Sequence, residues 1–159
     1  MKKSTTPRRK FIKDVGILGI SFGLMEHVNS VFGKNIPKGK RIGIIGLDTS
    51  HSIEFTKAFN DPGAGPEFAG YKVVFAYPKG SNDIESSAKR IPGYTEEIKK
   101  YGVKIAESIN QLLDNVDVVL LETNDGRLHL QQALQVFKAG KPVFIDKPIA
   151  ASLQDAVTI

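Results

Sequence analysis

The stretch RIGIIGLDTSH, Arg41 to His51, decides the fold. Its first half, Ile42 to Leu47, is a short apolar run rich in β-branched residues, which predicts a strand buried on both faces. Gly46 predicts a tight bend near the end of that strand. Ser50 or Ser52 can cap the helix that follows. The stretch therefore predicts a strand, a turn and a helix, the opening unit of an α/β domain.

Apolar runs and helical patterns alternate along the rest of the chain. Strands are predicted at 71–77, 103–106, 116–122 and 142–146, and helices are predicted to begin at Thr95, after Ser108, at Arg127 and at Ser152. A break in helical structure is expected at Pro92-Gly93. This order predicts the α/β class, a doubly wound parallel sheet with helices on both faces. Ligands bind outside the carboxyl ends of the strands in such sheets, so the segments after the strands form the candidate site.

The composition predicts a globular chain with one domain. It has 159 residues, of which 41% are hydrophobic and 25% are charged. Residues 1–33 hold six Lys or Arg and two acids, so they supply most of the net charge of +5. The remainder is nearly balanced and offers no basic excess to attract nucleic acid, so no nucleic-acid partner is expected. The absence of cysteine excludes disulfides and thiolate chemistry.

The N-terminus is predicted to be an export signal. PRRKFIK, residues 7–13, resembles the twin-arginine signal, and an uncharged, mildly apolar stretch follows at 15–25. That stretch is too short to span a bilayer. We therefore expect a signal peptide over 1–33, a linker over 34–40, a periplasmic location and a globular domain over 41–159. An amphipathic helix with a basic start is the alternative.

The turn at Gly46 shares the first half of a dinucleotide-binding fingerprint. Gly46 can form the bend, and the hydroxyls and amides of Thr49 and Ser50 lie where a helix N-terminus can hold an anion. Asp48 and His51 occupy the positions of the other two fingerprint glycines. A carboxylate at Asp48 disfavours a diphosphate unless it is hydrogen-bonded or turned away. On its own this turn predicts a nucleotide site and a plain structural turn equally.

Later strand ends carry further candidates. After the second strand, Lys79 and Ser81 stand where an acid that binds the ribose is expected. A cation and a hydroxyl at this place favour the 2′-phosphate of NADP. The alternative is that this segment is a surface loop without a ligand. Asp146 and Lys147 end the last strand, where the Lys147 ammonium can polarise a carbonyl or exchange a proton. His129 follows the fourth strand and is a cap, a packing residue or an acid–base group. The spacing of the histidines and acids matches no known metal motif, so no metal is predicted.

Three segments together resemble the Gfo/Idh/MocA family of NAD(P)-dependent oxidoreductases. They are RIGIIG, VDVVLLETNDGRLHLQQAL and AGKPVFIDKP, and the resemblance covers about residues 41–159. It implies a Rossmann-like fold, NAD or NADP as cofactor, and a sugar or cyclitol alcohol as substrate. It also implies that Lys147 is the active-site lysine, that Asp146 contacts the nicotinamide ribose, and that Thr123 and Asn124 line the nicotinamide pocket.

The chain departs from the family pattern in several places. Only one fingerprint glycine is present, the acid after the second strand is absent, and the loop between Thr123 and His129 is one residue longer. The family's second domain, which supplies much of the substrate pocket, is also absent, so this chain alone is expected to show little or no turnover. There are two alternatives to an oxidoreductase. One is a non-catalytic binding protein, and the other is a lyase or hydrolase with a resident nicotinamide. A homo-oligomer is compatible with the sequence.

Overall fold

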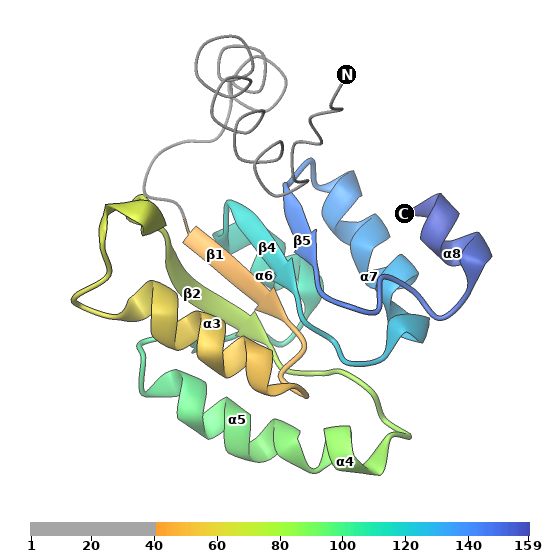
Figure 1. Cartoon of the computed structure of the whole chain (residues 1–159), viewed down its shortest axis with the longest axis horizontal. Helices are drawn as coiled ribbons and strands as arrows, with labels where there is room; N and C mark the ends of the chain where they lie inside the picture. Colours follow the sequence, from red (N-terminus) through yellow and green to blue (C-terminus); the bar gives the residue numbers. More distant parts are fainter. Residues whose placement is uncertain (1–40) are drawn as a thin grey trace, which may run out of the picture. The chain divides into compact units, whose positions relative to one another are not determined.

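Five parallel strands form one sheet in the computed structural model, which describes residues 41–159 (Figure 1). The strands are β1 (Arg41–Ile45), β2 (Lys72–Tyr77), β3 (Lys104–Ile105), β4 (Val118–Leu121) and β5 (Val143–Ile145). Their order is β3-β2-β1-β4-β5, so β1 pairs with both β2 and β4. The winding reverses between β1 and β4, which is the point where doubly wound sheets hold ligands. The predicted fold class is confirmed, while the predicted signal peptide (1–33) and linker (34–40) lie outside the described residues.

Helices connect successive strands and cover the sheet. They are α3 (Ser50–Asn60), α4 (Glu85–Ala88), α5 (Arg90–Lys99), α6 (Ile109–Asn115), α7 (Gly126–Lys138) and α8 (Leu153–Thr158), with a 3-10 turn, η1 (Pro66–Phe68). The predicted caps Ser108 and Ser152 are confirmed, since each side chain accepts a hydrogen bond from a backbone amide of its helix. Thr49, rather than Ser50 or Ser52, caps α3.

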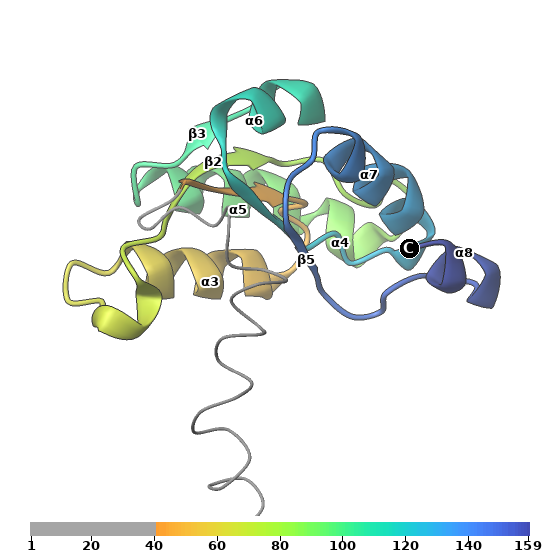
Figure 2. The ribbon, with the colours of Figure 1, turned by 90° about the horizontal axis from the view of Figure 1, so that it is seen from above.

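Two hydrophobic cores pack against the two faces of the sheet. One core joins Ile42, Ile44 and Val73 of the sheet to Ile53 of α3 and Ile98 of α5. The other joins residues of β1 and β4 to α6 and α7, with the buried members Ile45, Leu112, Leu113, Val119, Leu121, Ala133 and Val136. Figure 2 shows α3 on one side of the sheet, with α6 and α7 on the other. These cores fix the carboxyl edge of the sheet, where the candidate residues lie.

The predicted break at Pro92-Gly93 is wrong. Helix α5 begins at Arg90 and runs through both residues to Lys99. Pro92 is the third residue of that helix, where a backbone N–H has no partner within the helix in any case. The helix expected to begin at Thr95 therefore starts five residues earlier, at Arg90.

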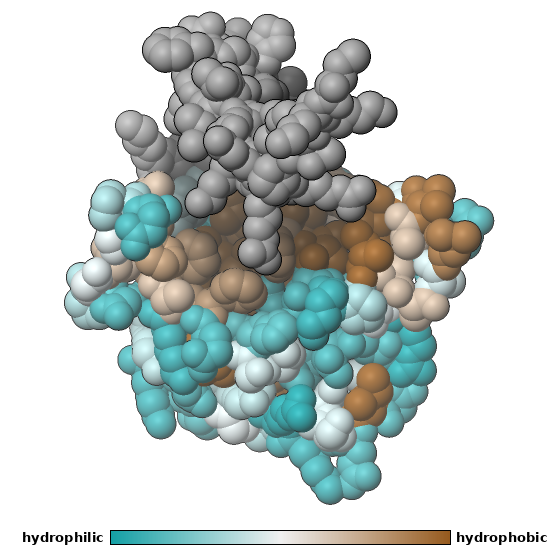
Figure 3. Space-filling view, viewed as in Figure 1, coloured by the Kyte–Doolittle hydropathy of each residue, from teal (hydrophilic) through white to brown (hydrophobic). Residues whose placement is uncertain are grey.

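Helix α8 is the least buried of the described helices. Leu153 and Val157 are 81% and 75% exposed, and Phe144 of β5 is 49% exposed. Figure 3 shows apolar side chains gathered over this part of the molecule. Among residues 41–159, no helix combines the length and apolar character that crossing a bilayer requires.

Candidate functional site

The turn after β1 needs glycine at position 46. Gly46 has a φ of 94°, and a Cβ built on it would lie 2.5 Å from the backbone nitrogen of Thr123. The Gly46 amide also donates to the Tyr77 carbonyl at 2.9 Å. The turn therefore brings the end of β1 into close contact with the ends of β4 and β2.

Asp48 is completely buried between the loops that follow β2 and β4. Its Oδ2 accepts a hydrogen bond from the Ser81 amide at 3.0 Å, and its Oδ1 accepts one from the Asn124 amide at 3.0 Å. The carboxylate is thus hydrogen-bonded, which is one of the two arrangements under which a diphosphate is tolerated there. Gly80 makes room for it, because a Cβ on Gly80 would lie 2.3 Å from Asp48 Oδ2.

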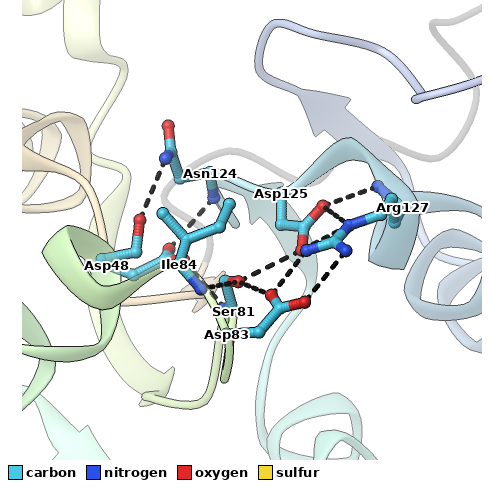
Figure 4. Close-up of polar contacts among 8 residues, drawn as sticks. Asp48, Ser81, Asp83, Ile84, Asn124, Asp125 and Arg127 are labelled. Carbon is cyan, nitrogen blue, oxygen red and sulfur yellow. Dashed lines mark hydrogen bonds and ion pairs between the residues drawn. The ribbon is translucent and has the colours of Figure 1, made fainter.

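A polar network extends from Ser81 to the start of α7 (Figure 4). The Ser81 hydroxyl lies 3.0 Å from Asp83 Oδ1 and 3.2 Å from Asp125 Oδ2, and it accepts a hydrogen bond from the Ile84 amide. The Arg127 guanidinium donates to both Asp83 and Asp125. The network uses both the amide and the hydroxyl of Ser81, which is buried. The Ser81 side chain therefore joins the loops after β2 and β4 and lies beneath the surface of the site.

The network has marked electrostatic effects. Hydrogen bonds from Arg127 lower the pKa of Asp125 to about 2, against the opposing effect of burial. The same guanidinium lowers the pKa of Asp83. Asp125 also caps α7, since its Oδ1 accepts from the Arg127 amide at 3.0 Å. The lengthened segment between Thr123 and His129 therefore contains a helix cap and ion pairs, through which Arg127 at the start of α7 ties the β2 and β4 loops together.

Glu122 follows β4 directly, and its side chain is completely buried. Neither carboxylate oxygen has a hydrogen-bond partner among the described residues. Burial first, and then the charge of Asp146, raise the pKa of Glu122 from 4.5 to about 8, while the charge of Lys147 acts in the opposite direction. An unpartnered buried carboxyl group is costly, which makes this residue a candidate for function.

His51 and Asp146 meet beside Glu122. His51 Nδ1 lies 2.5 Å from Asp146 Oδ2, and the two side chains are 40% and 15% exposed. Burial acts to raise the pKa of Asp146, but the hydrogen bonds from His51 and from the Lys147 amide outweigh it and the net shift is downward. The segments that follow β1 and β5 are thus joined by a direct contact between the side chains of His51 and Asp146.

His129 and Thr123 are both buried. His129 Nε2 lies 2.6 Å from the Thr123 carbonyl oxygen, and Nδ1 lies 3.2 Å from that of Ile149. The imidazole therefore ties the β4 loop to the segment after β5. These contacts are what we expect of a packing residue, which is one of the alternatives given for His129. They also orient the loop that carries Asn124.

The two lysines of the candidate site are exposed. Lys147 begins the segment after Asp146, and its peptide bond to Pro148 is cis. Lys79 lies at a cavity of about 210 Å³ between the β2 loop, α6 and α7, lined among others by Tyr77, Leu128 and Gln132. This cavity opens beside the carboxyl ends of the strands, where doubly wound sheets hold nucleotides.

These features fit a bound dinucleotide. Gly46 provides the tight turn, the cavity offers a partly apolar wall for a base, and Asp146 can accept hydrogen bonds from ribose hydroxyls. Asp48 is the one departure, but its carboxylate is fully buried and already bonded to two amides. Both of its oxygens are therefore occupied by protein donors.

Comparison with known proteins agrees with this geometry. The family model described as an oxidoreductase family with an NAD-binding Rossmann fold matches residues 40–159. The chain belongs to the Gfo/Idh/MocA oxidoreductase family. An uncharacterised oxidoreductase from Streptococcus pneumoniae is 39% identical over 59 residues, which are 36% of this chain and 16% of that protein. The family membership confirms the resemblance read from the three sequence segments.

Solved structures of similar fold come from several enzymes. A UDP-N-acetylglucosamine 3-dehydrogenase from Acidithiobacillus ferrooxidans has a TM-score of 0.54 at 19% identity, covering 75% of this chain and 32% of its own. A 3-ketoreductase from Actinomadura kijaniata, in complex with TDP-benzene and NADP, has a TM-score of 0.51 at 22% identity, covering 74% and 33%. The chain therefore spans about a third of the length of these solved relatives, and the likeness shows the fold.

The sequence did not identify Glu122, Asp125 or Arg127 as site residues. Glu122 directly follows the most apolar strand, at the edge of the sheet where ligands bind. That position is the signal in the sequence that could have identified Glu122 as a site residue. Asp125 stands just before α7 and has the side chain of an N-cap. Nothing in the sequence pairs Arg127 with Asp83, because the two loops meet only in three dimensions.

Proposed function

We propose that residues 41–159 form the NAD(P)-binding half of an oxidoreductase that acts on a hydroxyl-bearing carbon of a sugar-like or cyclitol substrate. The observation that carries the proposal is that, in a chain of this family, the tight turn at Gly46 contacts Tyr77, which also lines the cavity beside the carboxyl ends of the strands. The nicotinamide, when bound, supplies hydride transfer. Because the chain spans about a third of its solved relatives, the activity and substrate of the whole protein are part of the proposal.

Each residue has a task in this proposal. The amides at the start of α3 hold the diphosphate by their partial positive charge, and Asp146 holds the ribose hydroxyls. Exposed Lys147 moves a proton at the substrate oxygen. Thr123 and Asn124 hold the β4 loop in position through His129 and Asp48.

Lys79 supports a preference for NADP over NAD. It is exposed and lines the cavity after β2, where the acid that binds an unphosphorylated ribose is absent. A 2′-phosphate placed there would meet an ammonium group. We also propose that the protein is exported to the periplasm by its twin-arginine motif, a route compatible with cofactor binding before export.

Nucleotide titration of the purified chain tests the proposal. We expect saturable binding of NADPH, followed by its fluorescence, and weaker binding of NADH. The variant Lys79→Glu should reduce NADPH affinity at least tenfold and NADH affinity less. The matched control is Lys138→Glu, which makes the same charge change at the last residue of α7, a residue that does not line the cavity. No binding of either nucleotide by folded protein would favour the non-catalytic alternative.

A second assay separates binding from turnover. We expect the 159-residue chain to bind nucleotide but to oxidise or reduce no polyol or ketose at a measurable rate. Steady turnover of a polyol with NAD(P) by this chain alone would contradict that expectation.

A further inference from the structure

We propose that His51, Glu122 and Asp146 form a binding site for one divalent first-row transition metal ion. Each residue follows a different strand: His51 lies in the first turn of α3 after β1, Glu122 directly follows β4, and Asp146 directly follows β5. One ligand atom from each lies within 4.8 Å of the other two. The three are distant in sequence, so spacing alone gave no indication of a site.

Glu122 is the independent indication that something binds between these side chains. It is completely buried, and both carboxylate oxygens lack a hydrogen-bond partner among the described residues. Buried carboxyl groups in folded proteins are normally hydrogen-bonded, paired with a cation or bound to a metal. A cation between Glu122, His51 and Asp146 would give Glu122 the missing partner.

The spacing of the ligand atoms suits a shared ion. Zinc–ligand distances of about 2.0–2.2 Å place ligand atoms around one ion no more than about 4.4 Å apart. The three ligand atoms lie within 4.8 Å of one another, and a rotation of the His51 side chain must lengthen its 2.5 Å hydrogen bond to Asp146 before both residues can bind one ion. His51, whose side chain is 40% exposed, has the freedom to make that rotation.

The donor set indicates the class of metal. One imidazole nitrogen with carboxylate oxygens suits Zn²⁺, Mn²⁺ or Fe²⁺ better than Mg²⁺ or Ca²⁺, which prefer oxygen ligands alone. Three protein ligands leave coordination positions for water or for substrate oxygens, as in catalytic zinc sites.

Lys147 is the competing source of positive charge. Its charge acts on both Glu122 and Asp146. If the ammonium and one proton on a carboxyl group together balance the charge of Glu122 and Asp146, the cluster needs no metal. The two possibilities differ in whether the protein takes up an ion, so direct binding measurements separate them.

The experiment uses the full chain, purified without a histidine tag, stripped with EDTA and kept free of nucleotide. Calorimetric titration with ZnCl₂ measures stoichiometry, and titration with CoCl₂ reports coordination through its visible absorption. The variants are His51→Gln, Glu122→Gln and Asp146→Asn, which preserve approximate shape, and circular dichroism checks that each is folded. The control His27→Gln removes the histidine that lies outside the described residues.

We expect one equivalent of Zn²⁺ to bind, and Co²⁺ to give a visible spectrum of low-symmetry coordination. Each of the three variants should weaken binding at least tenfold, and His27→Gln should leave it unchanged. Absence of stoichiometric binding by the folded wild-type chain would overturn the proposal. So would binding that survives in all three variants. Because no nucleotide is present, this result is independent of the proposed NAD(P) binding.

Discussion

Replacing Gly80 by alanine tests the buried position of Asp48. A Cβ at residue 80 would lie 2.3–2.7 Å from the three atoms of the Asp48 carboxylate, which is too close for any real contact. The carboxylate cannot move without breaking its hydrogen bonds to the amides of Ser81 and Asn124. Leaving a buried amide unsatisfied costs about 1–3 kcal/mol. We therefore expect Gly80→Ala to lower the free energy of unfolding by about 2–4 kcal/mol.

A double-mutant cycle isolates the contact between the two residues. Asp48→Ala should itself cost about 2–4 kcal/mol, because the same two amides lose their acceptor. In that background the three clashing atoms are gone, so adding Gly80→Ala should cost little or even stabilise slightly by restricting the unfolded chain. The expected coupling energy is about 2–4 kcal/mol, well above the error of additive behaviour.

Urea denaturation followed by circular dichroism measures all four proteins. Gly93→Ala is the matched control, because its Cβ would meet nothing within 4 Å and it lies inside α5. That control should stabilise by about 0.5–1 kcal/mol through helix propensity. If Gly80→Ala is as benign as Gly93→Ala, or if the costs of Gly80→Ala and Asp48→Ala simply add, the placement of the Asp48 carboxylate is wrong.

Three further perturbations test other parts of the structure. Asp125→Ala should cost about 1–2 kcal/mol at pH 7, after allowance for solvent around Arg127, through the lost cap and ion pair. The pKa of Asp125 falls from its ordinary value of 3.8 to about 2 in the folded protein. The stability that its ionised form contributes is therefore complete well above pH 3.8 and is lost as the pH falls through about 2, which urea titrations across pH measure. His129→Ala should lower the free energy of unfolding by about 2–4 kcal/mol, since the ring is buried between two carbonyls; a change below 0.5 kcal/mol would contradict that placement. Leu153→Ser should change it by less than 0.5 kcal/mol, whereas Val136→Ser in the core should cost several times more, and thermal melts of both should show the difference.

The fold could be predicted from the sequence because its pattern is local and regular. Buried parallel strands such as Ile42–Ile45 are continuous apolar runs, and Ser108 and Ser152 mark helix starts by side-chain chemistry alone. The error at Pro92 has an equally local cause. Proline is tolerated in the first turn of a helix, and the sequence did not show that α5 begins at Arg90.

The candidate site was only partly predictable. Topology places the residues after parallel strands at one edge, so Asp146 and Gly46 could be assigned to the same region from sequence. Which side chains touch depends on long-range packing. The contact of His51 with Asp146, and the burial of Glu122 beside them, required the three-dimensional arrangement of β1, β4 and β5.

We expect the carboxyl edge of this sheet to bind NAD(P) although Asp48 replaces a fingerprint glycine. The most direct test is an NMR titration of the ¹⁵N-labelled chain with NADPH, which reports each backbone amide separately. We predict saturable shifts confined to the segments 46–52, 79–82, 123–126 and 146–147. An unchanged spectrum at millimolar NADPH, or shifts confined to other segments, would contradict the claim.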